Sequence, residues 1–128
     1  MIRTLEIDGR RIALRVNDDG WRKGRKTIFF IHGSGCDHHL WDHQYGFLDE
    51  EFNVAGIDLP GHGGSGGPGE ESVEAYALWV RKILDTAGLE KPILVGHSLG
   101  AAISLTFPLR WGEKLLAIVP VGGAATMP

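Results

Sequence analysis

The stretch KPILVGHSLGAA, from Lys91 to Ala102, decides the fold that we predict for this chain. A short apolar run bounded by Pro92 predicts a buried strand, and a helix-forming run follows the pentapeptide G-H-S-L-G. The sequence therefore predicts a strand, a tight turn with Ser98 at its apex, and a helix. We expect the turn to strain the serine backbone and to lift its Oγ clear of the sheet. Gly96 and Gly100 leave room there, because side chains at both positions would collide as the strand and the helix approach each other.

Length and composition describe an ordinary globular chain. The 128 residues suffice for one modest domain with a core, and 43% of them are hydrophobic. The net charge of −3 argues against a nucleic-acid partner, and the basic cluster at residues 22–26 is interpreted as a solvated loop. No signal-peptide pattern and no apolar run near the roughly 18 residues of a membrane span are visible. The single cysteine, Cys36, cannot form an internal disulfide, so we expect a cytoplasmic protein. From the charge and the apolar runs we expect that it binds neither nucleic acid nor membrane.

The order of apolar patterns along the chain predicts alternating strands and helices. Strands are expected at residues 2–8, 11–17, 27–31 and 52–59, directly after Pro92, and at 115–121. Helices are expected at residues 40–50, between Ser72 and Gly88, and at 99–111, where Pro108 should kink or shorten the last one. The first two strands are expected to form a hairpin. The alternation of strands and helices after it predicts an α/β fold with a mainly parallel sheet and right-handed crossovers.

Three motifs follow three of the predicted strands. His32-Gly33 follows the third strand, the stretch from Asp58 to Gly63 the fourth, and the stretch from Gly96 to Gly100 the fifth. In this order and at these places they resemble the motifs of the α/β-hydrolase family, and the resemblance covers nearly the whole chain. It implies a sheet with flanking helices in the strand order 1-2-4-3-5-6, the N-terminal six strands of an eight-strand core. Residues 1–128 are then expected to be the N-terminal part of one core domain, with the cap, beginning near 124–128, and the C-terminal strands absent from this chain.

The predicted turn suggests acyl-transfer chemistry. Such chemistry needs a nucleophile, a base, an orienting acid and donors for the developing oxyanion. Ser98 is the candidate nucleophile, and the backbone N–H of Leu99, at a helix start, is one candidate donor. The resemblance places the second donor on the backbone N–H of Ser34. It also implies loop or pocket support from a further set of residues: His32, Gly33, Gly35 and His97.

The base and the acid are not found where the resemblance implies them, after the serine. Beyond Ser98 the sequence contains no histidine, no aspartate and one glutamate, Glu113. We expect the C-terminal half of the same hydrolase, as a companion segment or chain, to supply both, and residues 1–128 alone to be inactive. The resemblance implies a cofactor-independent serine hydrolase of a small ester-like substrate. Alternatives are a C–C bond, lactone or amide hydrolase of the same fold, or a catalytically inactive binding module.

A histidine-rich segment at residues 37–43 offers a second interpretation. His39 and His43 would lie one helical turn apart, a spacing that can chelate zinc, and His38 and two aspartates are nearby. The pattern does not establish a third ligand, so the sequence predicts no metal site. Cys36 directly follows the segment from His32 to Gly35, which we call the Ser34 loop, and is interpreted as a small packed residue.

Overall fold

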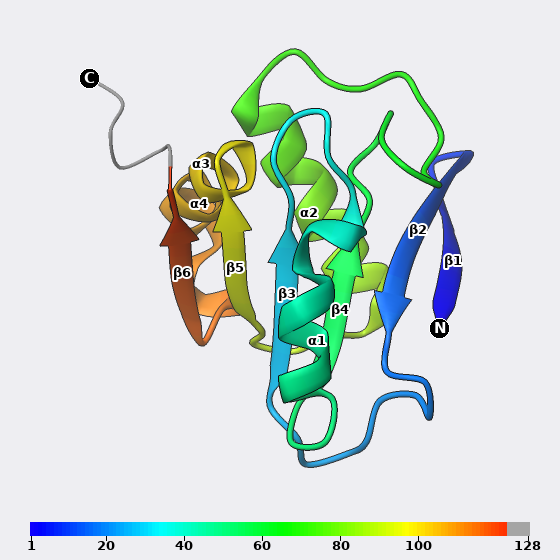
Figure 1. Cartoon of the computed structure of the whole chain (residues 1–128). Helices are drawn as coiled ribbons and strands as arrows, with labels where there is room; N and C mark the ends of the chain where they lie inside the picture. Colours follow the sequence, from blue (N-terminus) through cyan, green and yellow to red (C-terminus); the bar gives the residue numbers. More distant parts are fainter. Residues whose placement is uncertain (123–128) are drawn as a thin grey trace.

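The computed structural model describes residues 1–122 and contains one six-stranded sheet (Figure 1). The strands are β1 (Ile2–Ile7), β2 (Arg10–Val16), β3 (Thr27–Ile31), β4 (Asn53–Ile57), β5 (Ile93–His97) and β6 (Ala117–Val121). They lie in the order β1-β2-β4-β3-β5-β6, as predicted. β1 and β2 form an antiparallel hairpin, β2 pairs antiparallel to β4, and the remaining pairs are parallel. The predicted fold class is confirmed.

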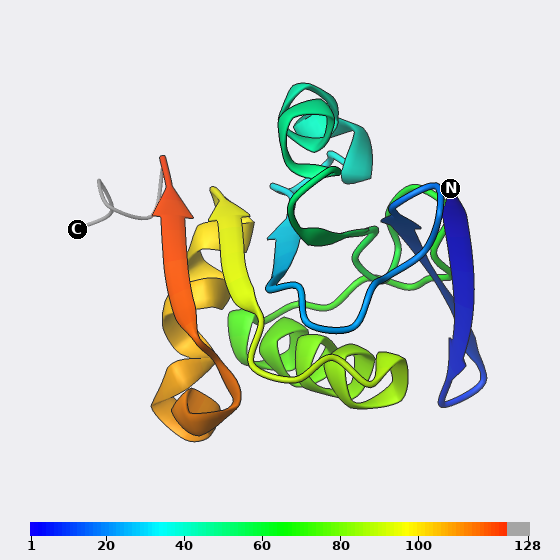
Figure 2. The same cartoon turned by 90° about the horizontal axis from the view of Figure 1, so that it is seen from below.

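Helices cover both faces of the sheet (Figure 2). One face carries α1 (Asp42–Leu48), preceded by the 3₁₀ turn η1 (His38–Trp41). The other face carries α2 (Val73–Ala87), α3 (Leu99–Thr106) and α4 (Pro108–Trp111), and the 3₁₀ turn η2 (Gly112–Lys114) leads into β6. All residues of β3 and β4 are buried, since both faces of these strands are covered. The apolar side chains divide into a large cluster under α2 and α3 and a smaller one under α1.

Local signals set most helix ends. The Ser72 hydroxyl accepts the Ala75 N–H at 3.1 Å at the start of α2, and Gly88 ends this helix with a φ of 72°. Pro108 begins α4, so the predicted break in the last helix is confirmed. The helix expected at residues 40–50 differs. Because the Asp37 carboxylate accepts the His39 N–H at 2.9 Å, a 3₁₀ turn forms first and the α-helix begins only at residue 42.

Two expectations concern the ends and the environment of the chain. Within residues 1–122, no helix combines the length and the apolarity that crossing a bilayer requires. The expected start of a cap at residues 124–128 lies outside the described residues.

Candidate active site

Ser98 lies at the carboxyl end of β5, directly before the first residue of α3, and its side chain is exposed. Its φ of 57° and ψ of −110° are unusual for any residue but glycine and cost about 1–3 kcal/mol. The Ser98 N–H donates to the Val121 carbonyl at 3.2 Å, and the Ala102 N–H donates to the Ser98 carbonyl at 3.1 Å. The strained turn expected from the sequence is therefore present, and β6 and α3 both hold it.

Two glycines allow the turn to form, although they meet different neighbours from those expected. A Cβ at Gly96 would lie 2.1 Å from the Gly100 carbonyl oxygen, which is the expected collision of strand and helix. A Cβ at Gly100 would instead lie 2.1 Å from the carbonyl oxygen of Ile31 and 2.9 Å from that of His32. We expected a side chain at Gly100 to collide with β5, and this expectation was wrong, because it would collide with the end of β3. This glycine lets α3 approach the end of the neighbouring strand β3.

The loop after β3 contacts the serine. Gly33 is buried, and a Cβ there would lie 3.3 Å from the Ser98 Cβ. The Cys36 N–H donates to the Gly33 carbonyl at 3.1 Å, which closes a turn with Ser34 and Gly35 exposed at its tip. The N–H groups of Ser34 and of Leu99 have no acceptor among residues 1–122. The structure thus brings the Ser34 loop next to Ser98, with a free backbone donor on each side.

His32 joins this loop to the loop after β4. Its Nε2 accepts the Leu59 N–H at 3.0 Å, so the proton is assigned to Nδ1, which donates to the Gly33 carbonyl at 2.6 Å. The ring is fully buried, and burial lowers its pKa below the usual 6.5. His32 is therefore a neutral structural link whose two nitrogens are both used.

Asp58 is a site residue to which the sequence analysis assigned no role, although it lies in a quoted motif. Its carboxylate is 1% exposed, and Oδ1 accepts both the backbone N–H of His38 and its Nδ1–H at 2.8 Å. Oδ2 accepts the Gly64 N–H at 2.9 Å. The Ser65 hydroxyl donates to the Asp58 carbonyl at 2.5 Å and accepts the Ala13 N–H. An acid directly after a buried strand was the available signal, since such a buried charge needs several donors.

His97 packs beside the serine. Its Nδ1 lies 3.4 Å from an ideal Cβ at Gly33, and its Cδ2 lies 3.3 Å from one at Gly122. The Nδ1 atom is buried and has no hydrogen-bond partner within residues 1–122. The His97 ring is therefore wedged between the Ser34 loop and the end of β6.

The sequence suggested that His39 and His43 could form a pair, but the structure brings a different set of residues together. One ligand atom each from Asp37, His38 and His39 lie within 4.8 Å of one another, and His43 does not belong to this group. His43 is exposed on α1.

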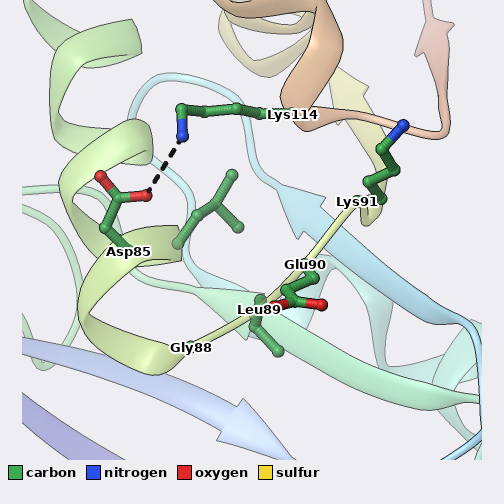
Figure 3. A pocket seen from close by; sticks show the side chains of 7 residues that line it. Asp85, Gly88, Leu89, Glu90, Lys91 and Lys114 are labelled. Atoms are coloured by element: carbon green, nitrogen blue, oxygen red, sulfur yellow. Dashed lines mark ion pairs between the residues drawn. The ribbon is translucent and has the colours of Figure 1, made fainter.

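A cavity of about 460 Å³ lies at the opposite end of the sheet (Figure 3). Its lining comes from the end of α2, the segment before β5 and η2: Leu84, Asp85, Gly88, Leu89, Glu90, Lys91 and Lys114. The cavity adjoins the start of β5, whereas Ser98 follows its end. This volume therefore does not mark the site that the motifs indicate.

Comparison with known proteins places the chain in a family. The model of the alpha/beta hydrolase fold matches residues 26–128. The 2-hydroxy-6-oxononadienedioate/2-hydroxy-6-oxononatrienedioate hydrolase of Paraburkholderia phymatum is 31% identical over 127 residues, covering 94% of this chain and 43% of the relative. Epoxide hydrolase A of Mycobacterium tuberculosis is 30% identical over 118 residues, covering 88% and 36%.

A solved structure agrees with these relatives. The crystal structure of a membrane phospholipase A superposes with a TM-score of 0.85 at 28% identity, covering 92% of this chain and 38% of that one. The chain thus spans less than half the length of each of these three proteins. Its strand order, its motifs in sequence order and these similarities agree: the chain belongs to the α/β-hydrolase fold family.

Proposed function

We propose that the chain is the serine-bearing part of a hydrolase that cleaves carboxylic ester or related acyl bonds through an acyl-enzyme on Ser98. The observation that carries this proposal is the conformation of Ser98. It is exposed and strained at the apex between β5 and α3, and Gly33 lies against it. A serine needed only for a turn has no reason to be held in this costly conformation with its hydroxyl exposed.

The neighbouring backbone groups suit the proposed chemistry. As the Ser98 Oγ attacks a substrate carbonyl, negative charge develops on the carbonyl oxygen. The free N–H of Leu99 at the start of α3 and that of Ser34 are the proposed donors to this oxyanion. Each donor is expected to contribute about 3 kcal/mol of transition-state stabilisation. The positive end of the α3 dipole adds to the effect, and the reaction requires no cofactor.

The general base and its orienting acid are proposed to come from outside residues 1–128. Residues 99–128 contain no histidine, both nitrogens of His32 are hydrogen-bonded, and His97 is wedged against Gly33 and Gly122. A companion segment, the C-terminal half of the hydrolase, would lie along β6. The exposure of aliphatic side chains in β6 and directly before it supports this placement: Leu116 is 51%, Val119 45% and Val121 39% exposed.

Labelling with a fluorophosphonate probe tests the nucleophile. The protein together with the segment that supplies the base should be labelled once per chain, and Ser98→Ala should abolish the labelling with an unchanged melting temperature. Labelling that persists in Ser98→Ala overturns the assignment. Residues 1–128 alone should show no Ser98-dependent hydrolysis of a p-nitrophenyl ester. Such turnover by the pure chain would contradict the proposal that the base comes from a companion.

A backbone substitution tests the oxyanion donor. Ser34→Pro removes the N–H, and it should lower kcat by about 10²–10³-fold. Ser34→Ala keeps the N–H and is the matched control, with near-normal kcat expected. Equal losses in both variants would show that the side chain, and not the N–H, matters there.

A second candidate is hydrolysis of a carbon–carbon bond, favoured by the similarity to the Paraburkholderia phymatum enzyme. The substrate in its name carries hydroxyl, oxo and carboxylate groups and no ester, so hydrolysis must break a C–C bond. Ser98 and both donors would serve that reaction equally. Comparing the hydrolysis of a p-nitrophenyl ester with that of 2-hydroxy-6-oxononadienedioate separates the two candidates. Epoxide opening is disfavoured, because epoxide hydrolases of this fold carry aspartate at the position where this chain has Ser98. A folded protein that hydrolyses neither substrate and is not labelled by the probe would be the catalytically inactive binding module.

The remaining expectations from the sequence stay proposals. We propose a small-molecule substrate, because nothing in the charge pattern favours a polymer. A cytoplasmic location is supported by Cys36 being the only cysteine.

A further inference from the structure

Three consecutive residues between β3 and α1 bring metal-ligating side chains together. Asp37, His38 and His39 each offer one ligand atom, and these three atoms lie within 4.8 Å of one another. The two imidazole rings are 4.2 Å apart between centroids and tilted by 36°. Bonds of 2.0–2.2 Å to a tetrahedral ion require ligand atoms about 3.4 Å apart. The ligand atoms are therefore at most about 1.4 Å farther apart than in an occupied tetrahedral site, and the exposed His39 side chain can move to close this gap.

Both histidines are oriented by carboxylates outside the group. The His38 Nδ1 lies 2.8 Å from Oδ1 of the buried Asp58, and the His39 Nδ1 lies 3.0 Å from Oδ2 of Asp42. A proton held on Nδ1 by a carboxylate leaves the lone pair of Nε2 free and makes it more basic. Metal-binding histidines almost always carry this second interaction. The Asp58 carboxylate is itself fixed by the Gly64 N–H, so the orientation of His38 does not depend on the metal.

The local charge also suits a cation. Asp37, Asp42 and Asp58 surround the two rings, and within residues 1–122 none of these carboxylates forms an ion pair with lysine or arginine. A positive ion bound there would offset this negative charge. Imidazole ligands favour Zn²⁺, Ni²⁺ or Co²⁺ over Mg²⁺ and Ca²⁺.

We propose that Asp37, His38 and His39 form a binding site for one divalent transition-metal ion. Its ligands are one carboxylate oxygen and the two Nε2 atoms, and at least one coordination position remains for water. The site lies on the same loop as Ser34, and it does not depend on the proposed hydrolase activity.

Calorimetric titration of Zn²⁺ and of Ni²⁺ into chelator-treated protein without a polyhistidine tag tests the proposal. One ion should bind per chain, and Mg²⁺ should not compete. His39→Ala should weaken binding by at least tenfold, and this variant should fold because the His39 side chain is 66% exposed. Asp42→Asn, which alters only the orienting carboxylate, should weaken it by about 10–100-fold.

Two variants serve as matched controls. His43→Ala and Cys36→Ser should each bind as the unchanged protein does, and the Co²⁺ complex should lack a thiolate charge-transfer band. Loss of binding in His43→Ala would assign the site to a different histidine pair, and loss in Cys36→Ser would assign it to the thiol. Either result, or the absence of stoichiometric binding, overturns the proposal.

Discussion

The two ends of the parallel strands differ in how tightly the chain is packed. At the carboxyl end, a Cβ at Gly96 or at Gly100 would lie 2.1 Å from a backbone oxygen, and a strained serine lies between them. At the amino end, a cavity of about 460 Å³ opens, and Lys114 reaches toward Asp85 at 4.0 Å (Figure 3). The strained serine turn is thus produced by close approach of backbone segments, whereas the open space lies where flexible charged side chains meet. Cavity volume alone would indicate the opposite end of the sheet from the proposed nucleophile.

Gly100→Val should disrupt the close packing at the carboxyl end of the strands more than any of the substitutions that follow. The new Cβ would meet the Ile31 carbonyl oxygen, which belongs to backbone and cannot rotate away. We expect the free energy of unfolding to fall by more than about 3 kcal/mol. Chemical denaturation measures this loss. The control is Gly46→Ala within α1, where a Cβ meets nothing within 4 Å, and this variant should gain about 1 kcal/mol. A Gly100→Val protein of normal stability would contradict the packing argument.

His32→Gln tests the link between the two loops at the carboxyl end. Loss of a buried ring that is bonded at both nitrogens should cost about 1–3 kcal/mol. Burial lowers the pKa of His32, so the unfolded chain takes up a proton near pH 6.5 while the folded chain does not. The contribution of His32 to stability is therefore complete above pH 6.5 and is lost as the pH falls below it. Denaturation at pH 7.5 and 5.5 should show a smaller difference in His32→Gln, and an unchanged pH dependence would refute the linkage.

Ser98→Gly tests whether the serine backbone stores strain. Glycine adopts a φ of 57° freely, so we expect the free energy of unfolding to rise by about 1 kcal/mol while probe labelling disappears. Ser98→Ala removes the same hydroxyl without relieving the backbone and is the control. Equal stabilities of the two variants would show that the conformation is not costly.

Lys114→Ala tests the amino end of the strands and should change the free energy of unfolding least. The side chains of Lys114 and Asp85 are 36% and 53% exposed, so their pairing is screened by water. We expect a change of no more than about 0.5 kcal/mol and no change in probe labelling. A loss comparable to that of His32→Gln would mean that the amino end is also tightly constrained.

The features that the sequence predicted well depend on neighbouring residues. The residues of β3 match the apolar run at 27–31, and the ends of α2 follow from Ser72 and Gly88, because caps and periodicity are local. The strand order came from the family resemblance and is confirmed. These local signals, with the resemblance, were enough for the fold and for the position of Ser98.

The features that the sequence did not predict join segments far apart in the chain. Gly100 contacts Ile31, and Asp58 holds His38 and Gly64. No periodicity or cap encodes such contacts, because they depend on how three loops meet at one edge of the sheet. The close approach of Asp37, His38 and His39 was not predicted for the same reason. The orienting carboxylate, Asp58, follows a strand that comes after α1 in the chain.

The hydrogen bond from the Ser98 N–H to the Val121 carbonyl has a consequence for biosynthesis. A ribosome delivers Val121 well after Ser98, so a nascent chain ending within α3 carries the serine without the strand that holds its backbone nitrogen. Strained conformations persist only where surrounding structure over-determines them. We therefore expect Ser98 to take up its strained conformation late, after β6 has docked, and chains stalled before residue 121 to expose a serine with a relaxed backbone.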